Sequence, residues 1–469
     1  MDVEGFARMV LEAMPFEPTD QQVKLTAALA RYCSAFTPSD SVFILNGYAG
    51  TGKTSVMGAL VRSLGAVRMP TVLLASTGRA AKVLSGFTGH PAFTIHRKIY
   101  GSPVLGPDGR FHARLLPNPH SNTVFIVDEA SMIGNDPDTG VGGLLEDLIM
   151  YVFSGINCRL IFVGDTAQLP PVGCDESPAM DPDTLRGMGL RVTRATMTRT
   201  VRQKESSGIL FNATWQRRAM GAVPLPEPRL YARPFPDIAI TDSDDLEDTL
   251  TDSFATFGDE RTIIITRSNR RALDFNLGVR QIVYDRTERL CRGERLVLAK
   301  NNYFWTRGVD GIDFIANGEM AVVEEIYGIE TRNDYQFADV LLRLPDHDIS
   351  LKAKLNLESL TSESAGLPFQ VARTVEEQAI LDAGLVNPSA TARRQALRSD
   401  PYHNALQVKY AYAVTCHKAQ GGQWDSVFID MGYIPPEAYG SIDFYRWLYT
   451  ATTRATTRLT FINPALPVV

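Results

Sequence analysis

The chain has 469 residues, which is long enough for two or three domains with well-buried cores. With 44% hydrophobic and 21% charged residues it has the composition of an ordinary soluble globular protein, and no uncharged apolar stretch approaches membrane-spanning length. Asp2 and Glu4 precede any apolar run, so we expect no signal peptide and a cytoplasmic location. The five cysteines are scattered without a C-x-x-C pair, which argues against a zinc site or a disulfide framework and predicts free thiols.

The net charge of −6 is only a weak argument against a nucleic-acid partner, because the charges are unevenly distributed. An acidic run lies within residues 242–252, whereas basic side chains cluster within 79–98 and again within 191–204. A groove for single-stranded nucleic acid needs only local positive charge and aromatic stacking partners. The total charge therefore does not exclude DNA or RNA.

The first strong motif is a complete G-x-x-x-x-G-K-T phosphate loop, Gly47-Tyr48-Ala49-Gly50-Thr51-Gly52-Lys53-Thr54. The apolar run 41–46 predicts a buried strand that enters the loop, and residues 55–60 predict a helix that leaves it. The glycines allow backbone N–H groups to close around the β- and γ-phosphates, Lys53 adds a positive charge, and Thr54 can ligate Mg²⁺. A glycine-rich turn is the alternative, but the flanking strand and helix favour a nucleotide site.

Residues 100–122 carry Asp108-Gly109 between extended flanks. An Asp-Gly pair in that setting is typical of a β-hairpin. An exposed connecting loop is the alternative.

Polar residues follow two further predicted strands. After the strand at 124–127, Asp128 can hold the hydration shell of Mg²⁺ and Glu129 can activate the attacking water. An acidic pair that merely begins a turn is the alternative, and the preceding phosphate loop and strand favour the functional interpretation. After the strand at 160–163, Gln168 can sense the γ-phosphate, although a surface loop ended by proline is also open there.

Apolar strands alternate with helical or looped segments in two blocks, which predicts two α/β lobes, each with a parallel sheet covered on both faces. The strands of the first block are expected at 42–45, 72–75, 124–127 and 160–163, and those of the second at 262–266, 409–414, 426–429 and 458–462. An insertion at about 294–400 interrupts the second block. Its first half is β-like, and its second half, from about 372 to 398, is polar and helical in character.

The order of these motifs resembles that of the superfamily 1 DNA helicases, and within them the RecD-like and Dda-like group B enzymes. The resemblance extends from Thr19 to Leu459. In the first lobe, Thr19-Asp20-Gln21-Gln22 resembles the glutamine motif, and residues 75–82 and 94–97 resemble motifs Ia and Ib. Further along the chain, Arg202-Gln203 resembles motif IV, residues 413–421 resemble motif V and residues 448–455 resemble motif VI. Several segments are weak signals individually, whereas their joint order is specific.

The resemblance implies a role for each motif. Gln22 would contact the adenine, and Gly421 would join the nucleotide-binding residues. Arg202 and Arg454 would reach from the second lobe to the γ-phosphate, where a guanidinium stabilises the charge that develops once the lobes close. The implied catalytic set is Lys53, Glu129, Gln168, Arg202 and Arg454. The implied DNA contacts are Thr77, Gly78, Arg79, His96, Phe111, Thr415, His417 and Lys418. For His96 a structural role is equally open, and each arginine taken alone is also compatible with a surface side chain.

Three positions depart from the family pattern. Ser76 stands where many relatives have proline, and Gly422 follows Gln420-Gly421 where a small hydroxyl residue is usual. Cys416 replaces an aliphatic residue, and we expect it to fill the core.

The resemblance implies an α/β fold with two RecA-like P-loop NTPase lobes, a small β-hairpin insertion called 1B and an SH3-like β-barrel insertion called 2B. In the family the 1B hairpin acts as a pin that splits the duplex, so Phe111 and the Asp108-Gly109 turn are expected at the fork. The expected boundaries are 1–96 and 121–186 for lobe 1A, 97–120 for 1B, 187–293 and 401–469 for lobe 2A, and 294–400 for 2B with its helical extension.

The function implied by the resemblance is that of an ATP-dependent DNA helicase, which uses Mg²⁺, moves 5′ to 3′ along single-stranded DNA and unwinds duplex at junctions. It is expected to act as a monomer and not to bind a membrane. Its expected processes are DNA replication, repair or recombination, with proteins of those processes as partners. A 5′-to-3′ RNA or RNA–DNA helicase is the first alternative. A non-motor or inactive ATPase subunit of a recombination complex is the second, and the intact set of catalytic residues argues against inactivity.

Overall fold

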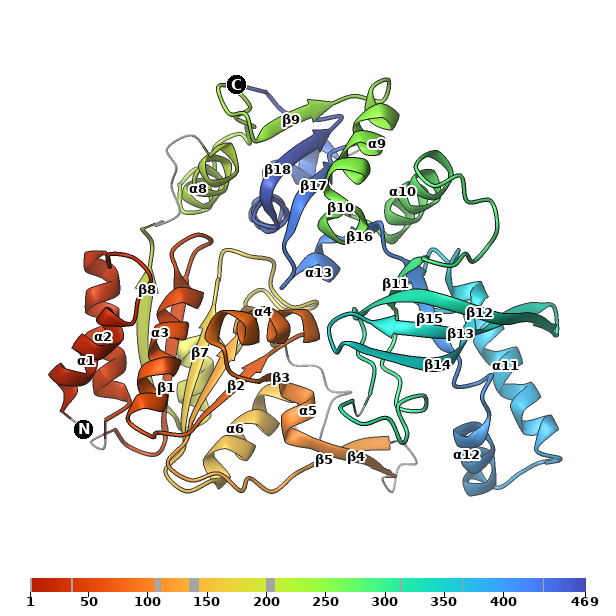
Figure 1. Ribbon diagram of the computed structural model, residues 1–469, viewed down its shortest axis with the longest axis horizontal. Helices are drawn as coiled ribbons and strands as arrows, with labels where there is room; N and C mark the ends of the chain where they lie inside the picture. The colour runs from red at the N-terminus through yellow and green to blue at the C-terminus, as the bar shows by residue number, and fades with distance from the viewer. Residues whose placement is uncertain are drawn as a thin grey trace.

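The computed structural model describes residues 2–34, 37–105, 111–134, 143–199, 207–312, 314–364, 366–432 and 434–469. Figure 1 shows two α/β lobes and a β-barrel arranged around a common centre, with the chain entering at the first lobe and ending in the second. Within the described ranges, no helix is both long enough and apolar enough to cross a membrane.

Six strands of the described residues form the sheet of the first lobe, in the order β3-β2-β6-β7-β1-β8, and all neighbours are parallel. They are β1 (Ser41–Gly47), β2 (Thr71–Ala75), β3 (Ala92–Thr94), β6 (Val124–Asp128), β7 (Arg159–Gly164) and β8 (Arg191–Met197). β1 is buried along its whole length because its side chains alternate between two cores. Phe43 and Leu45 pack on one face of the sheet, and Val42 and Ile44 pack on the other.

Helices cover both of these faces, as a parallel sheet requires. They are α1 (Val3–Glu12), α2 (Asp20–Tyr32), α3 (Lys53–Ala66), α4 (Gly78–Thr88), α5 (Ile95–Ile99), α6 (Leu144–Ser154) and α7 (Pro182–Gly187), with the 3-10 helix η1 (Ala130–Met132) after β6. α1, α2 and α3 pack on the face of Phe43, whereas α5, α6 and α7 pack on the face of Val42.

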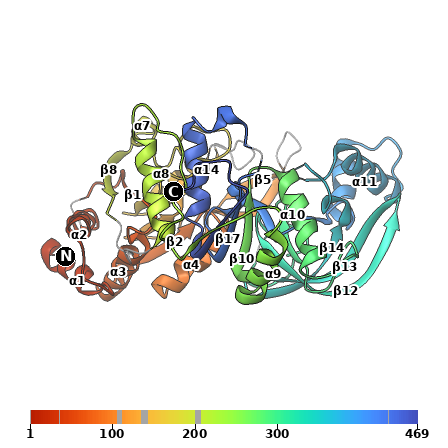
Figure 2. The same ribbon diagram turned by 90° about the horizontal axis from the view of Figure 1, so that it is seen from above.

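The second lobe has a parallel sheet in the order β16-β10-β17-β18-β9. Its strands are β9 (Ile238–Thr241), β10 (Thr262–Thr266), β16 (Ala413–Thr415), β17 (Trp424–Asp430) and β18 (Ala455–Ile462). Its helices are α8 (Gly208–Met220), α9 (Leu246–Phe257), α10 (Asn269–Ile282), α13 (Cys416–Ala419) and α14 (Ile442–Thr452), with η2 (Asp259–Arg261) and η4 (Pro436–Ala438). α8 and α14 lie side by side on one face (Figure 2), and α9 and α10 cover the other.

A closed β-barrel is inserted into the second lobe. It consists of β11 (Arg295–Leu298), β12 (Met320–Arg332), β13 (Tyr335–Leu344), β14 (Ile349–Asn356) and β15 (Leu406–Tyr410), with η3 (Leu357–Ser359), α11 (Phe369–Asp382) and α12 (Ala390–Ser399) between β14 and β15. One continuous hydrophobic core joins the barrel interior, for example Leu296 and Val340, to Phe254 of α9 and Phe275 of α10. The barrel is therefore packed firmly on the second lobe.

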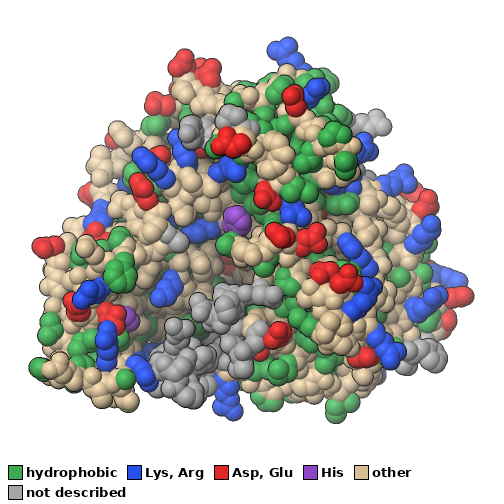
Figure 3. Space-filling model, turned by 180° about the vertical axis from the view of Figure 1, so that it is seen from behind, with side chains coloured by type: hydrophobic (Ala, Val, Ile, Leu, Met, Phe, Trp, Pro, Cys, Tyr) green, Lys and Arg blue, Asp and Glu red, His purple; other side chains and the backbone are tan. Residues whose placement is uncertain are grey.

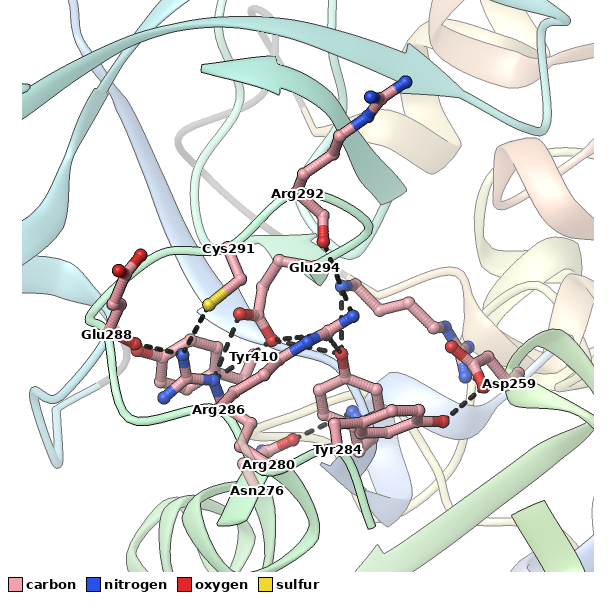
Figure 4. Close-up of polar contacts among 12 residues, drawn as sticks. Asp259, Asn276, Arg280, Tyr284, Arg286, Glu288, Cys291, Arg292, Glu294 and Tyr410 are labelled. Atoms are coloured by element: carbon pink, nitrogen blue, oxygen red, sulfur yellow. Dashed lines mark hydrogen bonds and ion pairs between the residues drawn. The ribbon is translucent and has the colours of Figure 1, made fainter. Parts of the chain in front are cut away.

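Buried charges reinforce this junction. Glu294, which is completely buried, accepts hydrogen bonds from Nε of Arg280 on α10 at 3.1 Å, from Arg286 at 3.3 Å and from the Tyr412 hydroxyl at 3.0 Å. Figure 4 shows the two arginines converging on the Glu294 carboxylate. Because a buried carboxylate is costly unless it is paired, this network holds together the strands that enter and leave the barrel.

The structure confirms the two lobes and the barrel. β4 (Tyr100–Leu105) and β5 (Phe111–Leu115) pair antiparallel, as the hairpin prediction requires, and the Asp108-Gly109 turn lies outside the described residues. The five cysteines are free thiols. Cys416 is 1% exposed and burial raises its pKa to about 12, so it fills the core as expected.

Two details differ from the sequence-based expectation. β8 pairs with β1, so the sheet of the first lobe continues beyond the expected boundary at residue 186. The single strand expected at 409–414 is two strands: β15 closes the barrel, and β16 joins the second lobe. The run of extended residues is interrupted between β15 and β16 because the side chain of Asn276 accepts hydrogen bonds from the N–H groups of Tyr412 and Ala413, at 2.8 and 2.9 Å.

Candidate nucleotide site and nucleic-acid interface

The phosphate loop joins the end of β1 to the start of α3. Gly50 and Gly52 have φ angles of 75° and 84°, in the left-handed region that favours glycine, and a Cβ on Gly47 would lie 2.8 Å from the Lys53 side chain. Nζ of Lys53 donates hydrogen bonds to the carbonyl oxygens of Gly47 and Tyr48. α3 begins without a side-chain cap, so its first N–H groups are available to an anion. Backbone donors and an ammonium group thus converge on one loop, which fits the phosphates of a nucleotide.

The two carboxylates stand at the end of β6. Oδ1 of Asp128 accepts a hydrogen bond of 2.9 Å from the N–H of Glu129, and Glu129 has a φ of 51°, which is uncommon for a residue other than glycine. Burial and the Glu129 carboxylate raise the pKa of Asp128 to about 6, and the Lys53 charge opposes the shift. Mg²⁺ is commonly held by one or two protein oxygens together with phosphates, and Thr54 and Asp128 supply such oxygens.

Gln22 lies against the phosphate loop and is completely buried. Its Oε1 accepts from the N–H of Thr19 at 2.8 Å, which completes a capping box at the start of α2, and its Nε2 donates to the carbonyl oxygen of Thr51 at 3.3 Å. Both ends of the amide are thus engaged in the structure, and the contact to adenine stays a prediction.

The neighbouring Gln21 has a role that the motif comparison did not indicate. Its Oε1 accepts from the N–H groups of Thr198 and Arg199, both at 2.9 Å. α2 therefore holds the segment that leads toward Arg202. Arg202 itself lies outside the described residues.

Gln168 follows β7 and is 5% exposed. Its Oε1 is buried and has no hydrogen-bond partner within the described part of the chain. A buried polar atom normally has a partner, so this oxygen can still accept a hydrogen bond, and the contact of Gln168 with the γ-phosphate stays a prediction. Three residues earlier, Asp165 is completely buried and its Oδ1 accepts from the N–H of Ala167 at 3.0 Å.

One face of α14 carries the contacts of the second lobe to the segment around Gln168. Arg446 donates to the carbonyl oxygen of Asp175 at 2.8 Å, and the Tyr449 hydroxyl donates to Oδ2 of Asp165 at 2.7 Å. Thr450 accepts from the N–H of Leu169 at 2.8 Å. Residues three and four apart lie on the same side of a helix, so this face of α14 packs on the first lobe.

The tip of the phosphate loop is also touched by the second lobe. The Tyr449 hydroxyl accepts a hydrogen bond of 2.9 Å from the N–H of Ala49. The guanidinium of Arg217 on α8 lies 4.0 Å from the centre of the Tyr48 ring. We did not predict a role for either side chain from the sequence. Tyr449 stands inside motif VI and was available as a candidate, whereas Arg217 lies in no motif.

Arg454 is 4% exposed and its hydrogen bonds remain within the second lobe. Its side chain donates to the carbonyl oxygens of Thr450 at 3.0 Å and Gly422 at 3.2 Å, and to the hydroxyl of Thr453 at 3.0 Å. To reach a phosphate it must leave these partners, so its role at the γ-phosphate stays a prediction.

The predicted DNA-contacting residues of motif Ia meet the segment after motif V. Thr77 caps α4 by accepting from the N–H of Ala80, and a Cβ on Gly421 would lie 3.0 Å from the Thr77 hydroxyl. Arg79 donates to the carbonyl oxygen of Gln423 at 2.8 Å. Gly421 therefore lies at this contact between the lobes.

The departure at Gly422 has a steric reason. A Cβ there would lie 2.4 Å from the indole of Trp424, so a hydroxyl residue does not fit.

The other predicted DNA contacts come from three elements. His96 on α5 packs between the rings of Tyr100, at 5.8 Å, and Phe314 of the insertion, at 6.1 Å. Thr415 is the N-cap of α13, where His417 is exposed and Lys418 is half-buried. Phe111 begins β5, which pairs with β4 directly after α5, and its role at a fork stays a prediction.

Comparison with known proteins matches both lobes. Residues 24–222 match the model of an AAA domain, and residues 410–462 match the model of a UvrD-like helicase C-terminal domain. The chain is 37% identical to the ATP-dependent RecD2 DNA helicase of Deinococcus radiodurans over 129 residues, which is 28% of this chain and 16% of that protein. It is 30% identical to the ATP-dependent DNA helicase Pif1 of Bdellovibrio bacteriovorus over 151 residues (32% and 34%) and 31% identical to the ATP-dependent DNA helicase dda of Enterobacteria phage T4 over 139 residues (29% and 29%). The matches thus span between 16% and 34% of the lengths of these relatives.

Solved structures of Pif1 helicases align along most of the chain. One is described as the structural basis for DNA unwinding at forked double-stranded DNA by two coordinating Pif1 helicases. The alignment with it covers 95% of this chain and 92% of that chain, with a TM-score of 0.48 and 16% identity. Another, Pif1 from Bacteroides in complex with ADP-AlF3 and single-stranded DNA, covers 94% and 92% with a TM-score of 0.46 and 15% identity.

The matches to both lobes agree with the motif order and with two parallel RecA-like sheets that meet at a phosphate loop. The chain belongs to the superfamily 1 group B helicases, the family of the RecD-like and Dda-like proteins.

Proposed function

We propose that the chain is an ATP-dependent DNA helicase that hydrolyses ATP with Mg²⁺, moves 5′ to 3′ along single-stranded DNA and unwinds duplex. The observation that carries this proposal is a nucleotide site divided between two lobes. The phosphate loop and Glu129 belong to the first lobe, whereas the side chains at the tip of the loop, Tyr449 and Arg217, belong to the second. A site shared in this way couples the bound nucleotide to the relative position of the lobes.

The residues of the first lobe have distinct tasks in this proposal. Thr54 and Asp128 hold the metal, Lys53 and the loop N–H groups hold the phosphates, and Glu129 accepts the proton of the attacking water. Mg²⁺, when bound, neutralises charge on the phosphate oxygens. Closure of the lobes would bring the arginines of the second lobe to the γ-phosphate.

Single-stranded DNA is the proposed track because the RecD2, Pif1 and dda relatives are each described as DNA helicases. The contact between Arg79 and Gln423 supports it, because a strand bound at both segments would be bound to both lobes. On the face opposite to that of Figure 1, the surface is hollowed near its centre, with both basic and acidic side chains nearby (Figure 3). The 5′-to-3′ direction rests on the resemblance to group B enzymes.

The test is the ATPase activity of the purified chain with and without oligo(dT), followed by unwinding of duplexes that carry a 5′ or a 3′ single-stranded tail. We expect ATPase activity stimulated by DNA and unwinding only from the 5′ tail. Lys53→Ala is the control, since it removes the charge at the phosphates and weakens nucleotide binding. ATPase activity without stimulation would indicate a non-motor ATPase, and activity restricted to RNA tails would indicate an RNA helicase.

A further inference from the structure

We infer that the hydroxyl of Tyr449 is a positioning group that couples the phosphate loop to the second lobe, by holding the N–H of Ala49 and the carboxylate of Asp165 in one hydrogen-bonded chain across the lobe interface. The inference deepens the proposed function and rests on it. Neither the motifs nor the comparisons assigned a role to this side chain.

The direction of each hydrogen bond follows from the groups involved. A carboxylate only accepts, so the hydroxyl donates its proton to Oδ2 of Asp165, 2.7 Å away. The hydroxyl oxygen then accepts from the N–H of Ala49, 2.9 Å away. Burial and the Asp165 carboxylate raise the pKa of Tyr449 well above its usual value, so the proton stays on the oxygen. Tyr449 is 1% exposed and Asp165 is 0% exposed, so solvent does not compete for either bond.

Both ends of this chain lie in the proposed nucleotide machinery. Ala49 belongs to the phosphate loop, whose N–H groups are the donors that bind phosphates. Asp165 begins the turn that carries Gln168, because the N–H of Gln168 donates to the carbonyl oxygen of Asp165 at 3.1 Å. A change at the loop therefore reaches the buried Gln168 oxygen and α14 through a single hydroxyl.

A phosphate group that takes over the Ala49 N–H would leave Tyr449 bound to Asp165 alone. The free energy of the contact between the lobes then differs between the empty and the occupied loop. Such a difference is what a coupling between nucleotide state and lobe position requires. A tyrosine that only fills the core, by packing its ring on Ala167 and Ala213, would show no such dependence.

The chain offers a matched control on the same helix. Tyr445 stands one turn earlier, is completely buried, and donates its hydroxyl to the carbonyl oxygen of Pro226 at 2.6 Å within the second lobe. Tyr449→Phe and Tyr445→Phe each keep the ring and remove one buried hydroxyl, but only the first removes a bond between the lobes.

The experiment measures kcat and KM for ATP at saturating oligo(dT), and the affinity for fluorescently labelled oligo(dT) without nucleotide and with ADP–aluminium fluoride. For Tyr449→Phe we expect kcat to fall by about 10-fold, whereas KM should stay within about 3-fold or fall, since the missing hydroxyl no longer competes with a phosphate for the Ala49 N–H. We also expect the affinities of Tyr449→Phe for oligo(dT) without nucleotide and with ADP–aluminium fluoride to become nearly equal. Tyr445→Phe should keep the wild-type ratio of these two affinities. In the double variant with Asp165→Asn the losses should not add, because both substitutions break the same chain.

Two outcomes overturn the inference: equal behaviour of the two tyrosine variants, or a lower kcat for Tyr449→Phe with an unchanged ratio of DNA affinities. Failure of the proposed function is distinguishable, because it shows as wild-type protein without DNA-stimulated ATPase activity before any variant is compared.

Discussion

The guanidinium carbon of Arg79 lies 4.0 Å from the centre of the Trp424 ring, and the same side chain donates to the carbonyl oxygen of Gln423. Arg79 stands at the start of α4 in the first lobe, and Trp424 begins β17 in the second. Burial lowers the pKa of Arg79 to about 10, with Asp346 of the barrel acting in the opposite sense. A side chain predicted to bind DNA thus also joins the two lobes.

This relationship leads to a prediction for Arg79→Lys, which keeps a positive charge and loses the planar group that stacks on the indole. We expect both Arg79→Lys and Arg79→Ala to reduce DNA-stimulated ATPase activity, because lysine lacks the planar guanidinium that stacks on the indole. The dependence of oligo(dT) binding on salt should be unchanged in Arg79→Ala. If Arg79→Lys behaves as wild type and the salt slope of Arg79→Ala falls by about 0.7, the residue binds a phosphate directly instead.

Glu129→Gln tests the assignment of the base. Glutamine does not accept the proton of the attacking water, so we expect turnover to fall by at least about 10²-fold while ATP and DNA binding persist. Steady-state ATPase rates and binding of a fluorescent ATP analogue measure the two quantities. Near-normal hydrolysis would assign the base elsewhere.

Arg454→Ala tests whether this buried arginine acts only when the lobes close. We expect nearly normal affinity for ATP and poor hydrolysis at saturating DNA, because the interaction is made only in the transition state. Arg458→Ala, at an exposed position of β18, is the control. Equal losses of affinity and turnover would show that Arg454 serves the bound ground state, and thermal melting of both variants identifies a loss of folding.

Glu294→Gln tests the buried network beneath the barrel. Without the carboxylate, Arg280 and Arg286 are left as buried charges without their partner, so we expect the free energy of unfolding to fall by about 3–5 kcal/mol. Glu363→Gln is the control, since its ion pair with Arg270 is long, at 3.9 Å, and exposed, and its loss should cost less than about 1 kcal/mol. Urea unfolding of both variants provides the measurement. Equal destabilisation would contradict the role of the network.

Replacing residues 106–111 with a short Gly/Ser linker tests the hairpin as a pin. Strand separation needs a stiff element with an apolar tip, since stacking of an aromatic ring on a base is worth about 1–3 kcal/mol. We expect DNA-stimulated ATPase activity and translocation to persist and duplex unwinding to be lost. Unwinding at the wild-type rate would place the wedge elsewhere, and the barrel insertion would be the next element to test.

The antiparallel pair β4–β5 and the barrel show which features a sequence pattern predicts well. Asp108-Gly109 is a local turn signal and the first half of the 294–400 insertion has a β-like pattern, and the strands predicted from both formed as expected. The limits of β8 and β15 were not predictable in this way. The apolar residues 409–414 form one continuous run, and only the side chain of Asn276, far away in the chain, decides where it divides between two sheets.

The phosphate loop, the acidic pair after β6 and the α/β character of both lobes are predictable from the residues alone. These features depend on short-range order: glycines where φ is positive, apolar runs long enough for a buried strand, and polar residues at strand ends. Which side chains of the second lobe meet the loop depends instead on how the two lobes pack together. Tyr449 lies 400 residues from Ala49 in the chain, and the contact exists because one face of α14 packs on the first lobe. No local pattern encodes such a contact, since it arises from the docking of two separately folded sheets.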